Sequence, residues 1–124
     1  MLDKAYASIS ERVLFHMPTY NKLVRDRIPQ LIMSQGKECR TRILDLEEYK
    51  QELRTKLREE AEEYFEANKG QEALEELADM LEVIRALAEV HGANAAELDK
   101  LRADKADARG GFQERVFLID VDET

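Results

Sequence analysis

The sequence predicts an all-α fold built on an antiparallel helical hairpin, and three observations support this prediction. Two amphipathic patterns of about twenty residues each follow one another, joined by a short loop that contains Gly70. Charged residues make up 37% of the chain and hydrophobic residues 44%, a balance that suits helices rich in Ala, Leu and Glu. At 124 residues the chain suits one domain with a modest core. We therefore expect a homodimer or higher homo-oligomer to complete the fold.

Charge and composition exclude several classes of partner. The net charge of −8 argues against binding to a nucleic acid polymer, which requires a basic surface. No apolar run approaches the roughly 20 residues that span a bilayer, and the first residues lack a secretory signal, so we expect a cytoplasmic protein with no membrane partner. The lone Cys39, His16 and His91 are interpreted as structural or surface residues.

The N-terminal residues have a weak apolar pattern that could form a short helix and ends at Met17-Pro18. We interpret residues 1–18 as an N-terminal extension and residues 19–124 as the domain. Met17 could itself be the natural start, which would make the first sixteen residues an upstream extension.

Short elements are expected on either side of the hairpin. Pro29 suits the first turn of a helix that continues through Met33, and Gly36 suits its end. Residues 41–46 could form an edge strand or an extended connector, and residues 116–119 could pair with them as a second short peripheral strand. A further short helix is expected at residues 94–102, followed by a polar loop at 105–111.

The two hairpin helices have clear boundaries in the sequence. Asp45 is the expected N-cap of the first helix, with Glu48 as its capping-box partner, and the helix should end near Asn68. The second helix should close at His91-Gly92. The apolar stripes, which would face each other or a partner chain, comprise Leu46, Tyr49, Leu53, Leu57, Ala61 and Tyr64 on the first helix and Leu74, Leu77, Leu81, Ile84 and Ala88 on the second.

Carboxylates gather beside both stripes. At about 100° per residue, Glu60 and Glu63 lie on one flank of the first helix, and Glu76 and Asp79 on one flank of the second. Like charges at these spacings repel by a few tenths of a kcal/mol, so this clustering is unfavourable unless a cation offsets it. Carboxylate oxygens without Cys or His suit Mg²⁺ or Mn²⁺, as one ion or two. The alternative is a solvated acidic face, which is what most glutamate runs on helices are.

Three segments carry a resemblance to a known family. Glu59-Glu60-Ala61-Glu62-Glu63, followed after twelve residues by Glu76-Leu77-Ala78-Asp79, resembles the paired signature of the MazG-like all-α nucleoside triphosphate pyrophosphohydrolases. Residues 20–29, Tyr-Asn-Lys-Leu-Val-Arg-Asp-Arg-Ile-Pro, resemble the opening of its phosphoribosyl-ATP pyrophosphohydrolase-like subgroup. Residues 105–112 resemble the basic Gly-Gly-Phe ending of that subgroup. The resemblance covers about residues 19–119.

The resemblance implies Mg²⁺-dependent cleavage, with Mn²⁺ as an alternative ion, between the α and β phosphates of a nucleoside triphosphate. The products would be a monophosphate and pyrophosphate. Metal ligands would be Glu60, Glu63, Glu76 and Asp79. The catalytic group would comprise Glu59, Glu60 and Glu63, with Glu59 acting from outside the ligand set or orienting water. Candidates to hold phosphate oxygens are Lys22, Arg25, Arg27, Lys56, Lys105 and Arg109.

Three alternatives remain open from the sequence. Lys56 could instead form an i, i+4 salt bridge with Glu60. The substrate could be phosphoribosyl-ATP, as a step in histidine biosynthesis. The chain could also be a non-catalytic helical interaction module, in which the apolar stripes bind a partner and the acids only solubilise.

Overall fold

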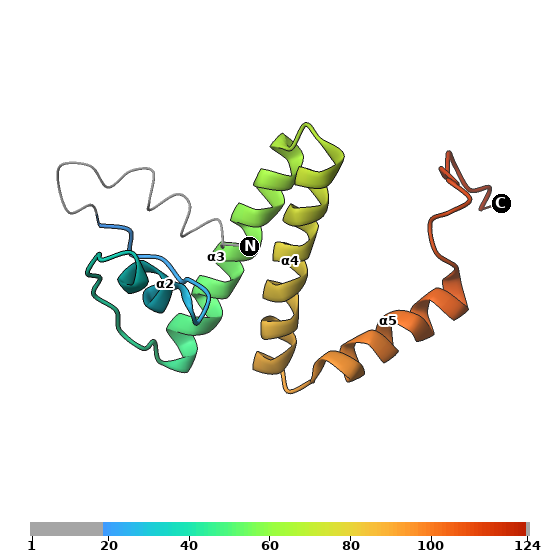
Figure 1. The fold of residues 1–124 in the computed structure, drawn as a ribbon. Coiled ribbons are helices and arrows are strands. Elements are labelled where there is room, and N and C mark those ends of the chain that lie inside the picture. Colours follow the sequence, from blue (N-terminus) through green and yellow to red (C-terminus); the bar gives the residue numbers. More distant parts are fainter. Residues whose placement is uncertain (1–18, 124) are drawn as a thin grey trace. The chain divides into compact units, whose positions relative to one another are not determined.

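The structure, a computed structural model, describes residues 19–123, so the extension and short helix expected at residues 1–18 lie outside the described residues. This described part contains four helices, α2 (Ile28–Ser34), α3 (Leu46–Glu66), α4 (Gly70–Val90) and α5 (Ala95–Arg109), and no strand (Figure 1). The predicted all-α class is confirmed. The chain divides into two units, Met1–Ile84 and Arg85–Thr124, each with its own internal contacts. None of the helices in residues 19–123 combines the length and apolar character needed to cross a bilayer.

α2 begins and ends where the sequence predicts. Pro29 occupies its first turn, and Gly36 just beyond its end has a φ of +77°, a conformation that glycine adopts readily. Ile28 and Ile32, one turn apart, are buried and form a small cluster with the partly buried Val24 and Leu31. α2 packs closely against α3.

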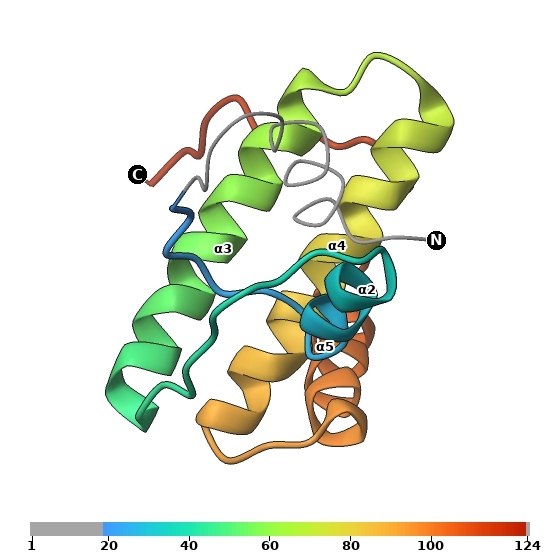
Figure 2. The same cartoon turned by 60° about the vertical axis from the view of Figure 1, so that its left-hand side comes forward.

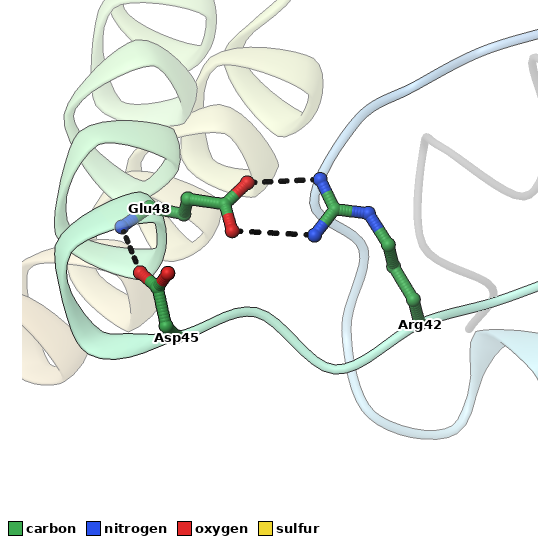
Figure 3. Close-up of polar contacts among 3 residues, drawn as sticks. All are labelled: Arg42, Asp45 and Glu48. Carbon is green, nitrogen blue, oxygen red and sulfur yellow. Dashed lines mark hydrogen bonds and ion pairs between the residues drawn. The ribbon is translucent and has the colours of Figure 1, made fainter.

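The start of α3 is fixed by the expected cap residue and by an ion pair (Figure 3). The Asp45 carboxylate accepts a hydrogen bond from the Glu48 backbone N–H at 2.9 Å. In place of the second half of the predicted capping box, the Glu48 carboxylate accepts hydrogen bonds from both terminal nitrogens of Arg42, at 2.9 and 3.3 Å. This contact raises the pKa of the Arg42 guanidinium.

α3 and the part of α4 up to Ile84 form the predicted antiparallel hairpin and lie side by side in both views (Figures 1 and 2). The buried positions of α3 are Leu53, Lys56 and Glu60, at i, i+3, i+7 spacing. Of the predicted stripe, Leu57 and Ala61 are only partly buried. The buried face of α3 is thus rotated toward its charged flank.

On α4 the buried face is rotated even further from the predicted apolar stripe. Leu74, Leu77 and Leu81 are 62%, 44% and 56% exposed, whereas Glu76 and Val83 are buried. The sequence allowed the two apolar stripes to face each other or a partner chain. The leucines of this segment of α4 do not face the stripe of α3. They are left on the surface of the unit, and an acidic residue occupies a buried position.

The two short strands allowed for at residues 41–46 and 116–119 are absent from the described residues. Ile43 is 95% exposed and Phe117 is 89% exposed. β-Branched and aromatic residues favour strands when they pack on a half-buried surface, and neither segment buries its apolar side chains. The strand pairing that the sequence allowed is therefore not formed, and residues 41–45 are the connector that it allowed as the alternative.

α5 in the second unit is longer than predicted. Asn94 and Glu97 form a complete capping box, in which each side chain accepts from the other residue's backbone N–H, at 2.8 and 3.2 Å. The helix continues to Arg109 and ends at Gly110, which has a φ of +84°. The loop expected at residues 105–111 is therefore helical for most of its length. Ion pairs at i, i+3 spacing (Asp99 with Arg102) and i, i+4 spacing (Lys100 with Asp104) stabilise the middle of α5, just before this stretch.

Candidate metal centre

Three of the four predicted metal ligands come together between α3 and α4. Glu60 and Glu63 lie one turn apart on α3, and Glu76 lies on the first half of α4. One carboxylate oxygen from each lies within 4.8 Å of the other two. Glu60 is 5% exposed and Glu76 is 6% exposed, whereas Glu63 is exposed to solvent. The group, which we call the acidic triad, is therefore buried at two corners and open at the third.

The acidic triad fits a hard divalent cation. Mg²⁺ binds oxygen ligands at about 2.1 Å in octahedral geometry, so adjacent ligands lie about 3.0 Å apart and opposite ones about 4.2 Å apart. Oxygens within 4.8 Å of one another would therefore need to close by up to about 1.8 Å, which requires rotation of the side chains when the ion binds. All donors are carboxylates, which favours Mg²⁺ or Mn²⁺ over zinc. The exposed Glu63 corner leaves access for water and for phosphate oxygens.

Lys56 is buried beside the acidic triad. Its ammonium nitrogen lies 3.6 Å from Glu60 Oε1, and the two side chains are 10% and 6% exposed. The i, i+4 salt bridge that the sequence allowed is therefore formed. It places one positive charge against a carboxylate that would be costly to bury alone.

Asp79, the fourth predicted ligand, is not a member of the group within 4.8 Å. Its Oδ1 accepts a hydrogen bond from Arg25 Nη2 at 2.7 Å. The side chains of Arg25 and Asp79 are 42% and 21% exposed. The structure thus joins a predicted phosphate-binding residue to a predicted metal ligand, a pairing that the sequence analysis did not foresee. The residues are 54 positions apart, so no local spacing could reveal it.

The other predicted site residues lie on both units. Glu59 precedes Glu60 on α3 and is partly buried. Lys22 and Arg27 are exposed in the segment that leads into α2. Lys105 and Arg109 are exposed positions of α5, in the unit Arg85–Thr124.

A surface hollow on α3 lies on a different flank of that helix. Its described lining residues are Gln51, Arg54, Thr55 and Arg58. At about 100° per residue, these side chains project away from Glu60 and Glu63. The hollow therefore does not belong to the acidic triad.

Comparisons with protein-family models, curated proteins and solved structures find no match to this chain.

Proposed function

We propose that this chain is a Mg²⁺-dependent nucleoside triphosphate pyrophosphohydrolase of the MazG-like type. One observation carries the proposal: two helices bring carboxylates of Glu60, Glu63 and Glu76 within 4.8 Å, at positions of the paired acidic signature. Acidic residues that only solubilise a helix have no reason to be buried, and two of these three are.

The proposed reaction is hydrolysis of the α–β phosphoanhydride. A water oxygen forms a bond to phosphorus, the anhydride P–O bond breaks, and pyrophosphate leaves with the bonding electron pair. The water proton passes to a carboxylate or to solvent. Bound Mg²⁺ would neutralise charge on the triphosphate oxygens.

This chain's residues have distinct parts in that reaction. The acidic triad would hold the cation, and Glu59 would orient the attacking water. The exposed Lys22 and Arg27 are candidates to bind phosphate oxygens, as are Lys105 and Arg109. Lys56 is better explained as the buried partner of Glu60 than as a phosphate ligand.

The proposal is tested by measuring pyrophosphate release from a panel of nucleoside triphosphates and phosphoribosyl-ATP, with Mg²⁺ and with chelator. Glu63→Gln is the informative variant because Glu63 is exposed and its loss should not disturb folding. We expect Mg²⁺-dependent turnover to fall by about 100-fold or more. Glu62→Gln, the same change at the exposed neighbouring position outside the acidic triad, is the matched control.

Two outcomes would contradict the proposal. Absence of Mg²⁺-dependent pyrophosphate release from every substrate would leave the non-catalytic interaction module as the better account. Equal activity of the Glu63 and Glu62 variants would remove the acidic triad from the mechanism. Preference for phosphoribosyl-ATP over all nucleoside triphosphates would keep the chemistry and change the substrate.

The exposed apolar side of α4 supports self-association as part of the proposal. Leu74, Leu77 and Leu81 recur at i, i+3, i+7 spacing and so form one stripe on the helix. Apolar residues grouped in this way on a small unit are typical of an interface. A second copy of the chain, with the same stripe, would cover it and complete a helical bundle.

A further inference from the structure

The ion pair between Arg25 and Asp79 lies next to the acidic triad. Asp79 follows Glu76 by three residues on α4, so the two carboxylates lie on the same face, one turn apart. Arg25 reaches this face from the segment before α2, with Nη2 at 2.7 Å from Asp79 Oδ1. The Arg25 guanidinium is therefore bound to Asp79, the last acid of the paired signature.

The backbone of Arg25 is held in place while its side chain is half-exposed. The Arg25 carbonyl accepts a hydrogen bond from the Ile28 backbone N–H at 3.0 Å, which forms the turn into α2. Its neighbour Val24 packs on the buried cluster of Ile28 and Ile32. The guanidinium, 42% exposed at the side-chain level, can thus move by rotation of its own side chain without displacing this turn.

The exposure of this ion pair separates it from the Lys56–Glu60 pair. Side chains of Lys56 and Glu60 are 10% and 6% exposed, against 42% and 21% for Arg25 and Asp79. A buried pair is costly to break, because it leaves an uncompensated charge in the interior. A partly exposed pair is weak, because water can solvate both partners once they separate.

We propose that Arg25 is an exchangeable counter-ion of Asp79, which moves from Asp79 to a substrate phosphate when metal and nucleotide bind. The inference rests on the proposed function and assigns Arg25 a defined part in it. Asp79, one turn from Glu76, would become a further ligand of a cation held by the acidic triad, so the cation and the guanidinium would compete for its carboxylate. A phosphate oxygen accepts a hydrogen bond from a guanidinium as a carboxylate oxygen does, so Arg25 gains an equivalent partner when it leaves Asp79.

This exchange predicts that loss of the Arg25 guanidinium changes metal affinity and nucleotide affinity in opposite directions. With the Arg25 side chain shortened and uncharged, the metal has one competitor fewer at Asp79 and should bind about 2- to 5-fold more tightly. The nucleotide loses a charged hydrogen bond and should bind about 10-fold or more weakly in the presence of metal. A residue that only stabilised the fold would shift both affinities in the same direction.

The test uses the full chain and two binding measurements. Free Mn²⁺ is followed by electron paramagnetic resonance during titration, and binding of α,β-methylene ATP is followed by calorimetry at saturating Mn²⁺. The variants are Arg25→Gln, Arg25→Lys, Asp79→Asn and the double variant Arg25→Gln/Asp79→Asn. Arg42→Gln is the matched control, because it removes another partly exposed Arg–carboxylate pair with the same change in charge.

We expect Arg25→Gln to bind Mn²⁺ more tightly and the nucleotide more weakly, Arg25→Lys to show smaller shifts in both, and Arg42→Gln to match the wild type. In the Asp79→Asn background, removal of Arg25 should leave Mn²⁺ affinity unchanged. Unchanged or weaker Mn²⁺ binding by Arg25→Gln would overturn the exchange while leaving the proposed function intact. Failure of the wild type to bind Mn²⁺ would overturn both.

Discussion

The buried ion pair of Lys56 and Glu60 allows a quantitative prediction. Replacing Lys56 by Met keeps most of the side-chain volume and removes the charge. At the 3.6 Å separation of Nζ and Oε1, the Coulomb attraction is about 4.6 kcal/mol with an effective dielectric constant of about 20. Removal of one partner of a buried pair typically costs about 3–5 kcal/mol. We therefore expect Lys56→Met to lower the free energy of unfolding by about 3 kcal/mol or more in chelator.

The chain contains a matched pair on the surface. Lys100 and Asp104 have the same i, i+4 spacing on α5 and a shorter separation of 2.9 Å, but their side chains are 77% and 61% exposed. Pairs of this kind contribute about 0.3–0.5 kcal/mol. If distance decided the energy, the Lys100 pair would be the stronger one. If burial decides, the Lys56 pair exceeds it several-fold.

The assay is a pair of double-mutant cycles, measured by urea unfolding with circular dichroism in chelator. One cycle combines Lys56→Met with Glu60→Gln, and the other combines Lys100→Met with Asp104→Asn. We expect a coupling energy of about 2–3 kcal/mol in the first cycle and at most about 0.5 kcal/mol in the second. Saturating Mg²⁺ should reduce the loss caused by Lys56→Met, because the cation supplies positive charge to the acidic triad. Equal coupling energies in the two cycles would refute this reasoning.

Two further predictions concern the surface of α4 and the start of α3. Leu77→Glu places a charge in the exposed apolar stripe, so sedimentation velocity over a range of concentrations should show less self-association than for the wild type. Identical sedimentation would argue against this stripe as the interface. Asp45→Ala removes the side-chain cap of α3 and should lower the free energy of unfolding by about 1 kcal/mol. Asp45→Asn, which retains an acceptor oxygen, should recover most of that loss in the same urea measurement.

The sequence predicts the helix boundaries well because local chemistry sets them. The Asp45 cap and the Pro29 turn act within a few residues of their own position, and both occur as expected. The end of α5 was misjudged for a related reason. Lys105 lies in a polar stretch without an apolar stripe, so periodicity gave no helix signal there, while the capping box at Asn94 and the ion pairs along α5 favour helix.

Which faces of the hairpin are buried could not be obtained from periodicity. The apolar stripe centred on Leu57 predicts a buried face, but the face that the unit buries is rotated toward Lys56 and Glu60. Helical angles placed Glu60 and Glu63 on one flank of α3, and residues on the same flank remain neighbours whichever way the helix turns. The register of α3 against α4 decides which carboxylate oxygens meet. In this register Asp79 pairs with Arg25 and does not join the acidic triad.

The burial of Glu60 and Glu76, with leucines of α4 left exposed, favours the proposed function of the acidic triad over a purely stabilising role. Leucines at the positions of Glu60 and Glu76 would give a comparable or greater stability, since well-packed apolar residues often equal or exceed a buried ion pair. The chain has suitable leucines on α4 but exposes Leu77 and buries Glu76. That arrangement lowers the stability of the isolated unit on both faces of α4. A cation at the acidic triad and a second copy of the chain at the leucine stripe would each relieve one of these costs. The same rotation of α4 that aims Glu76 at Glu60 also presents the leucines outward, so metal binding and self-association are expected to stabilise the same conformation.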